Sequence, residues 1–115
     1  MENTQTNNIT IDDVSRVEIK IGKILSAERV DGSDKLLKLS VDFAEASPRQ
    51  VISGIASQFP DPAVLVNASY PFVTNLEPRV IRGLESQAMI FAAMHEGTIA
   101  LLAPTSEVPP RTRLS

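Results

Sequence analysis

Two segments of this chain alternate apolar and polar residues with a period of two, and this alternation constrains the fold more than any other feature. In residues 17–21 and 37–43 every second side chain is apolar, and the side chains between them are charged or serine. Such alternation is typical of strands that bury one face. The stretch Asp-Gly-Ser-Asp at 31–34 separates the two segments and is typical of a turn. The sequence therefore predicts two strands joined by a turn.

Shorter β-branched or aromatic stretches predict further strands at 50–55, 70–73, 88–93 and 98–103. Pro71 indicates that its strand lies at a sheet edge, because proline has no N–H to donate to a neighbouring strand. The residues His-Glu-Gly at 95–97 predict a turn, with its glycine in the left-handed conformation, between the last two strands. Gly22 stands where the apolar phase of the first strand slips, which indicates a β-bulge at this glycine.

Helical signals are few. Residues 11–14 predict one short turn of helix with Thr10 as its N-cap. Residues 56–66 predict the one other helical stretch, which Pro60 and Pro62 keep short. Residues 76–86 are polar and predict a loop. Five or six short strands with little helix and glycine-marked bends favour an all-β fold, a small closed barrel.

The length of 115 residues suits one domain with a single core. We expect residues 1–10 to be a flexible N-terminal tail and residues 11–115 to form that domain. No run of about 18 apolar residues occurs, so the sequence predicts no membrane segment. The first residues lack the pattern of a signal peptide, and the start at Met1 suggests an independent chain. The absence of cysteine fits the cytoplasm, where we expect the protein to act.

The residue types needed for most catalytic or metal centres are scarce. Without cysteine the chain forms no disulfide, zinc ribbon or thiol nucleophile, and His95 is its single histidine. His95 precedes Glu96-Gly97, which fits a solvent-exposed turn. The acidic pair Asp12-Asp13 fits the first turn of a helix better than a metal site. We therefore expect no enzyme activity, no metal and no cofactor.

The charge of the chain neither predicts nor excludes binding to nucleic acid. The net charge of −3 argues mildly against it, because nucleic-acid-binding domains are usually basic. The acidic excess lies in the first 48 residues, whereas residues 49–115 carry equal numbers of acidic and basic residues. The second half therefore has room for a local basic patch.

The polar segment 75–91 combines rigidity with positive charge. Arg79 and Arg82 lie three residues apart, close to a proline and a glycine, and hydroxyl and amide side chains flank them. Guanidinium groups in such a setting suit phosphate oxygens and exposed base edges. The alternative is a solvent-exposed loop without a binding role, in which the arginines pair with Glu77 and Glu85. Residue chemistry alone does not decide between the two.

The same segment, NLEPRVIRGLESQAMIFAA, resembles the signature of the tRNA-binding domain family. This domain is found at the C-terminus of bacterial methionyl-tRNA synthetases, in free-standing tRNA-binding proteins and in the endothelial monocyte-activating polypeptide II family. The signature falls on Asn75, Pro78, Arg79, Arg82, Gly83, Ser86 and Met89. Weaker motif matches at 17–30, 33–36, 50–55 and 103–109 extend the resemblance to about residues 10–114. Val30 and Asp31 depart from it, since relatives usually have His-Pro there.

The resemblance implies an OB-fold, a five-stranded closed β-barrel, here with one short helix and flanking N- and C-terminal segments. It also implies recognition of the shape of the tRNA corner rather than of its sequence. We expect Arg79 and Arg82 to bind phosphates, Lys35 to add a second positive contact, and Asn75 and Ser86 to form hydrogen bonds nearby. Arg49 and Ser53 are weaker candidates, since Ser53-Gly54 also fits close packing of a barrel strand. We expect Met89 in the core.

The expected partners are tRNA, a second copy of the chain and an aminoacyl-tRNA synthetase. Stand-alone relatives are homodimers, and here residues 108–110 and Leu114 would supply apolar surface for the interface. The chain would assist a methionyl-tRNA synthetase in trans or form its C-terminal part. The alternative is a dimeric, secretion-related, peptide-binding chaperone of the same fold family. The arginine-containing signature favours RNA over this alternative.

Overall fold

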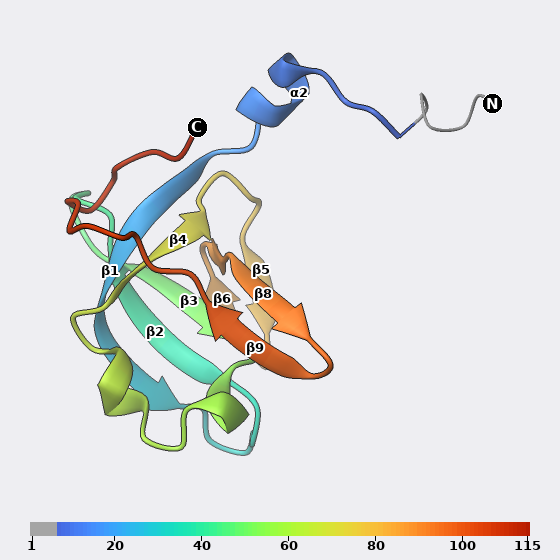
Figure 1. Cartoon of the computed structure of the whole chain (residues 1–115). Helices are drawn as coiled ribbons and strands as arrows, with labels where there is room; N and C mark the ends of the chain where they lie inside the picture. Colours follow the sequence, from blue (N-terminus) through green and yellow to red (C-terminus); the bar gives the residue numbers. More distant parts are fainter. Residues whose placement is uncertain (1–6) are drawn as a thin grey trace.

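A strongly curved antiparallel sheet forms the body of the molecule in a computed structural model, which describes residues 7–115 (Figure 1). Its strands, in the order β3-β2-β1-β4-β7, are β1 (Ile19–Arg29), β2 (Leu37–Asp42), β3 (Arg49–Ser53), β4 (Ser69–Val73) and β7 (Met89–Ile90). The N–H of Gln87 donates to the carbonyl of Gln50 at 2.8 Å, which brings the chain before β7 back beside β3. The predicted all-β, five-stranded barrel is therefore confirmed as a nearly closed barrel of OB-fold type.

The core consists of the inward-facing residues of this sheet. The alternation predicted for residues 37–43 is confirmed, because β2 alternates buried and half-buried side chains along its whole length. At the centre, the rings of Phe43 and Phe72 meet edge to face with centroids 5.4 Å apart. Burial of each such apolar side chain contributes about 1.5–3 kcal/mol. The fully buried side chains are Ile24, Leu37, Leu39, Val41, Phe43, Val51, Leu65 and Phe72.

The bulge predicted at Gly22 is wrong in position. Gly22 pairs regularly with Tyr70 of β4, and the register of β1 against β2 shifts between Ile24 and Ser26 instead. Gly22 is required for another reason: a Cβ atom there would lie 2.5 Å from the Val41 side chain and 2.6 Å from the Phe43 ring. The glycine therefore lets the backbone of β1 pass close to the core side chains of β2.

Pro71 does not mark a sheet edge, because β4 lies between β1 and β7. Pro71 stands opposite Ile21, whose N–H and carbonyl bond to Thr112 and Arg111 of the C-terminal segment at 2.8 Å each. The backbone groups of Ile21 therefore bond to the C-terminal segment and not to Pro71. For this reason the lack of an N–H on Pro71 costs no hydrogen bond between β1 and β4. The same contacts hold the C-terminal segment against β1 of its own chain.

The short helix predicted at 11–14 is confirmed as α2 (Ile11–Ser15). Thr10 caps it reciprocally with Asp13: the N–H of Asp13 donates to Thr10 Oγ1 at 3.1 Å, and the N–H of Thr10 donates to Asp13 Oδ2 at 3.2 Å. The helix stands away from the barrel and buries none of its residues (Figure 1). The predicted tail 1–10 lies for the most part outside the described residues.

The single helical stretch expected at 56–66 is two 3₁₀ turns, η1 (Ala56–Gln58) and η2 (Pro62–Leu65). Pro62 begins the second turn, where a proline costs no hydrogen bond, and the Asp61 side chain caps it by accepting from the N–H of Ala63. Two prolines so close together prevent one continuous helix here.

Two small hairpins complete the fold. They are β5 (Arg79–Ile81) with β6 (Leu84–Ser86), and β8 (Ala92–His95) with β9 (Thr98–Leu101). The first replaces part of the loop predicted at 76–86. Arg82 and Gly83, at φ 52° and 78°, form a two-residue turn that suits a tight hairpin. The second has the same geometry at Glu96 and Gly97, with φ 50° and 80°, and confirms the turn predicted there.

Met89 is not a core residue, since 44% of its surface is exposed. Its neighbours Ala88, which is buried, and Ile90, which packs against the core, occupy the inward phase of β7, so Met89 falls on the outward phase. The strand predicted at 88–93 also divides at Phe91, beyond which the chain turns into β8.

Candidate nucleic-acid interface

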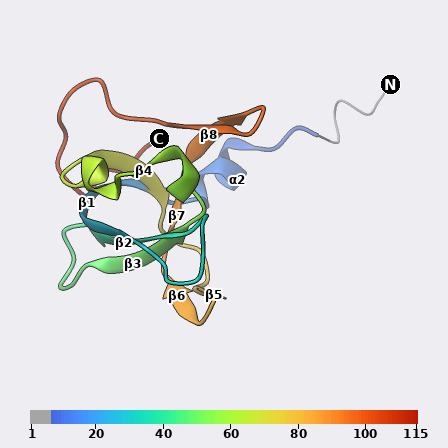
Figure 2. The ribbon, with the colours of Figure 1, turned by 90° about the horizontal axis from the view of Figure 1, so that it is seen from below.

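The β5–β6 hairpin is attached to the barrel along β3. The N–H of Ile52 donates to Ser86 Oγ at 2.9 Å, and Gln50 Nε2 donates to the carbonyl of Glu85 at 2.9 Å. The hairpin therefore projects from the barrel as a fixed element rather than as a mobile loop (Figure 2). Its outward-facing side chains are therefore presented to solvent at defined positions.

This hairpin carries both predicted arginines at exposed positions. Arg79 begins β5 and lines a small cavity of about 50 Å³ between the hairpin and the barrel. Arg82 occupies the hairpin tip, and its Nη2 donates to the carbonyl of Gly32 in the β1–β2 turn. Among residues 7–115 neither arginine forms an ion pair with Glu77 or Glu85. The alternative in which these arginines pair with Glu77 and Glu85 is therefore not seen in residues 7–115.

Lys35 lies in the turn that Arg82 reaches. Ser33 Oγ accepts hydrogen bonds from the N–H groups of Lys35 and Leu36, at 3.3 and 3.2 Å, and thereby shapes the turn. Gly32 adopts a positive φ of 79° in the same turn. The Lys35 side chain is exposed and has no ionic partner in residues 7–115. Lys35 and Arg82 therefore belong to one end of the barrel.

Asn75 has a structural role at the opposite end of β1. Its Oδ1 accepts from the N–H of Glu18 at 2.8 Å, and its Nδ2 donates to the carbonyl of Arg16 at 2.7 Å. Both functional groups of the amide are thus engaged with the backbone of the segment that enters β1. The side chain attaches this segment to the end of β4.

Ser86 and Ser53 are both buried. Ser86 Oγ accepts from the N–H of Ile52 and donates to the carbonyl of Ala88 at 3.1 Å, so its hydroxyl connects β6 with β3. Ser53 ends β3 opposite Leu37. The burial of Ser53 agrees with close packing of a barrel strand. Close packing does not explain why residue 54 is a glycine, because an added Cβ there would meet nothing within 4 Å.

Arg49 is committed to contacts within the barrel. Its Nε and Nη2 donate to the two carboxylate oxygens of Glu45 at 2.9 and 2.8 Å. Its Nη1 donates to the carbonyls of Thr74 and Gln87 at 2.7 and 3.2 Å, and its guanidinium lies 5.4 Å from the centre of the Phe43 ring. These contacts join β3 to the ends of β4 and β6, where the barrel closes.

Where the barrel closes, neighbouring groups stabilise the charged forms of Arg49, Glu45 and Glu18. The hydrogen bond from Arg49, together with its charge, lowers the pKa of Glu45, and the same bond raises the pKa of Arg49. A hydrogen bond of 2.7 Å from Thr74 Oγ1 lowers the pKa of Glu18, helped by Lys20 at 3.3 Å. These charges stabilise each other and are not available to a ligand.

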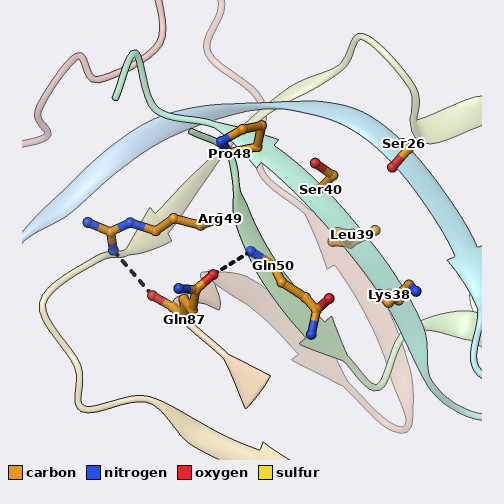
Figure 3. A pocket seen from close by; sticks show the side chains of 8 residues that line it. All are labelled: Ser26, Lys38, Leu39, Ser40, Pro48, Arg49, Gln50 and Gln87. Carbon is orange, nitrogen blue, oxygen red and sulfur yellow. Dashed lines mark hydrogen bonds between the residues drawn. The ribbon is translucent and has the colours of Figure 1, made fainter. Parts of the chain in front are cut away.

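A polar groove crosses the outer face of β1, β2 and β3 (Figure 3). It encloses about 270 Å³ and is lined by Ser26, Lys38, Leu39, Ser40, Pro48, Arg49, Gln50 and Gln87. Ser26 and Gln50 each pair with Ser40 from neighbouring strands, so their side chains form a row across the sheet. The groove was not predicted from the sequence. The only signal was the outward phase of the predicted strands, which carries no recognisable motif.

The seven predicted residues therefore divide into two groups. Arg79, Arg82 and Lys35 present their cationic groups to solvent on the hairpin and the adjacent turn. The other four have buried or internally bonded side chains: Asn75, Ser86, Arg49 and Ser53. Within residues 7–115 no group of three or more metal-ligating side chains occurs, and no helix has the length and apolarity to cross a membrane.

Comparisons with known proteins agree with this geometry. Residues 19–113 match the family described as "Putative tRNA binding domain". The methionine–tRNA ligase of Lactiplantibacillus plantarum is 40% identical over 94 residues, which are 82% of this chain and 14% of the ligase. The chain thus spans about one-seventh of that enzyme.

Solved structures give the same fold. The MetRS related protein from Pyrococcus horikoshii superimposes with a TM-score of 0.87 at 34% identity, covering 95% of this chain and 99% of that one. The chaperone CsaA from Bacillus anthracis superimposes with a TM-score of 0.83 at 24% identity, covering 94% and 99%, and shows the fold alone. The family match over most of the chain, with relatives of this identity, shows that the chain belongs to the tRNA-binding domain family.

Proposed function

We propose that this chain is a non-catalytic tRNA-binding domain that contacts the corner of tRNA through the β5–β6 hairpin and the neighbouring β1–β2 turn. One observation carries the proposal. Arg79, Arg82 and Lys35 are exposed on adjoining elements, and no ion pair within residues 7–115 neutralises them. A rigid group of cations of this kind suits the phosphates of a folded RNA.

The binding mode follows from the residue types present. Each guanidinium can donate two parallel hydrogen bonds to a phosphate, and Lys35 adds a point charge. The hairpin and the turn offer no aromatic side chain on which successive bases could stack. Contacts to the RNA backbone would therefore dominate, and the protein would recognise the shape of the tRNA corner.

The remaining predicted residues act indirectly in this proposal. Ser86 fixes the hairpin to β3, and Arg49 fixes the closure from which the hairpin projects. Asn75 secures the start of β1, and Ser53 packs at the end of β3. These side chains position the cationic group rather than touch RNA.

The relatives of this chain suggest which protein it would assist. The matched relatives are full-length methionine–tRNA ligases, of which this chain spans a small part. A domain that holds tRNA without catalysing a reaction would raise the local concentration of tRNA near a synthetase. The chain would do so in the cytoplasm, either in trans or as the C-terminal part of a methionyl-tRNA synthetase.

We further propose a homodimer. The apolar residues first expected at its interface, 108–110 and Leu114, remain part of this proposal, since Leu114 is 38% exposed. The β8–β9 hairpin offers a second exposed surface, because Ala93 and Ala100 pair on its outer face. Because residues 87–110 contain no lysine or arginine, this surface suits a second copy rather than RNA.

A competition titration tests the proposed function. Unfractionated tRNA is titrated into the full chain at two salt concentrations, with duplex DNA and an unfolded polypeptide as competitors. The proposal expects tRNA to outcompete both, with an affinity that falls as salt rises. Preference for the unfolded polypeptide would overturn it in favour of a peptide-binding chaperone.

A further inference from the structure

The side chain of Arg82 connects the tip of the β5–β6 hairpin to the β1–β2 turn. Its Nη2 donates to the carbonyl of Gly32, which lies 50 residues away along the chain. Within residues 7–115 the Arg82 side chain makes no other hydrogen bond, and Arg82 is exposed. A guanidinium carries several N–H donors, so most of them stay free for another acceptor. The bridge therefore restrains the guanidinium and still leaves it able to bind a ligand.

Gly32 presents its carbonyl from a tight turn. The N–H of Ser33 donates to the carbonyl of Val30 at 3.1 Å, which closes a β-turn over residues 30–33. Gly32 is the third residue of this turn and has a φ of 79°, whereas Asp31 before it has no positive φ. This is the pattern of a type II turn, which requires glycine or asparagine at the third position. The direction of the carbonyl therefore depends on the left-handed conformation of residue 32.

Space does not explain this glycine, because a Cβ atom at position 32 would meet nothing within 4 Å. The rest of the turn is held by other contacts. Ser33 Oγ accepts from the N–H groups of Lys35 and Leu36, and the carbonyl of Lys35 accepts from the N–H of Ala56 at 3.0 Å. Position 32 is thus constrained by its backbone conformation, and Lys35 is held in place by contacts that do not involve it.

The hairpin side of the bridge is fixed as well. Ser86 and Gln50 attach β6 to β3, as described above. Arg82 itself has a φ of 52°, which a residue with a side chain adopts only at a cost in backbone energy. Asparagine or glycine would suit this position of a two-residue hairpin turn better. The turn therefore does not account for the arginine, whereas a role of its side chain at the tip does.

We propose that Gly32 is a positioning residue for RNA binding, because its carbonyl preorganises the Arg82 guanidinium for a phosphate. Ordering one long, exposed side chain weakens a complex roughly two- to tenfold, and here the ordering is complete before RNA binds. The bridge also keeps the hairpin and the turn, which carry the cations, at one separation. This role rests on the proposed function and adds a backbone group to the three cationic side chains.

Two substitutions at position 32 of the full chain test this role. Gly32→Asn keeps the turn, because asparagine tolerates the left-handed conformation. Gly32→Pro cannot keep it, because proline fixes φ at about −65°. Neither substitution changes the charge, and within residues 7–115 the N–H of Gly32 makes no hydrogen bond that proline would remove. Gly32→Ala, which also disfavours a positive φ, replaces Gly32→Pro if circular dichroism melting shows that the proline variant is unfolded.

Nitrogen NMR of the arginine side chains measures the bridge in the absence of RNA. We expect an ordered Arg82 guanidinium in the native chain and in Gly32→Asn, and a mobile one in Gly32→Pro. A mobile Arg82 guanidinium in the native chain would overturn the positioning role, whether or not the chain binds tRNA.

Titration with unfractionated tRNA measures the consequence for binding. We expect Gly32→Pro to weaken binding roughly two- to tenfold, with an unchanged slope of log affinity against log salt, because no charge is lost. Gly32→Asn should bind as the native chain does. In a chain that carries Arg82→Ala, Gly32→Pro should cause no further loss, because its effect acts through the arginine.

Three results would overturn the positioning role alone. They are native affinity in a folded Gly32→Pro variant, an equal loss in Gly32→Asn, and a loss from Gly32→Pro that persists in the Arg82→Ala chain. The last result would mean that the turn acts without Arg82. Failure of the native chain to bind tRNA would instead overturn the proposed function.

Discussion

The two small hairpins share a backbone geometry and differ in the chemistry that they expose. Each joins its strands by a two-residue turn with positive φ, at Arg82-Gly83 and at Glu96-Gly97. The β5–β6 hairpin carries two exposed arginines, whereas the β8–β9 hairpin carries exposed alanines and Met94. In our proposal the same supersecondary unit would serve two purposes, and the exposed side chains would decide which partner each hairpin suits. We expect RNA at β5–β6 and a second copy at β8–β9.

The largest effect should come from placing charge on the β8–β9 hairpin. The double substitution Ala93→Glu and Ala100→Glu would bury carboxylates of the same charge in the proposed interface, at a cost of about 3 kcal/mol or more. We expect self-association to weaken at least hundredfold, as measured by analytical ultracentrifugation. The matched control is Val80→Glu, because Val80 is 73% exposed on the β5–β6 hairpin and should leave the dimer intact. A double variant that still dimerises would show that this hairpin is not the interface.

The second effect concerns the arginine at the tip of the β5–β6 hairpin. Arg82→Ala should weaken tRNA binding by about 1–3 kcal/mol, the range for a hydrogen bond to a charged group. The slope of log affinity against log salt should become shallower by about 0.7–0.9, because one phosphate contact is lost. The melting temperature should barely change, since an exposed side chain contributes little to stability.

Arg111→Ala is the matched control, because Arg111 is exposed but lies at the C-terminal segment beside Ile21. It removes the same charge from a surface that the proposal leaves without RNA. An equal loss of affinity in both variants would mean that net charge, and not the hairpin, determines tRNA binding.

The third effect separates a positioning arginine from a binding one. Arg49→Ala should destabilise the fold by about 1–2 kcal/mol, because it leaves Glu45 and the carbonyls of Thr74 and Gln87 without their partner. Arg82→Ala should change the free energy of unfolding by less than about 0.5 kcal/mol. Urea denaturation of both variants measures the difference, and equal stability losses would refute the division into two groups.

The smallest effect is a pH dependence of stability at the barrel closure. The pKa values of Glu45 and Glu18 are lowered in the folded state below their ordinary value of 4.5. Their contribution is therefore complete above that value and is lost as the pH falls through the lowered folded-state pKa values. Glu45→Gln should flatten the fall in the urea midpoint between neutral and strongly acidic pH. The same slope in the native chain and the variant would show that Glu45 makes no such contribution.

Local signals in the sequence predicted those elements that depend on neighbouring residues. Thr10 and Asp13 are three residues apart and cap α2 as expected, and the alternation at 37–43 produced β2. Gly22 was recognised as special for the wrong reason. Its requirement comes from Val41 and Phe43, which the sequence places about twenty residues away and only the fold brings into contact.

The candidate site shows the same limit. Asn75, Ser86 and Arg49 have side chains suited to RNA, but each bonds to at least one partner that lies 25 to 59 residues away along the chain. Only the bonds of Arg49 to Glu45 and of Ser86 to Ala88 are local. A family signature identifies such residues without saying whether they bind or position. Arg79 and Arg82 were recognised as exposed cations because an arginine near a turn usually faces solvent, but the bond from Arg82 to the carbonyl of Gly32, 50 residues away, could not be predicted.

Hydrogen–deuterium exchange of the full chain, with and without unfractionated tRNA, tests whether tRNA contacts the β5–β6 hairpin and the β1–β2 turn. We expect tRNA to slow exchange in residues 30–36 and 79–87, the turn and the hairpin that carry the cations. We expect no tRNA-dependent change in residues 92–101, because the β8–β9 hairpin contains no lysine or arginine and is proposed to contact a second copy. Protection by tRNA at 92–101, with none at 30–36 or 79–87, would show that tRNA binds elsewhere on the molecule.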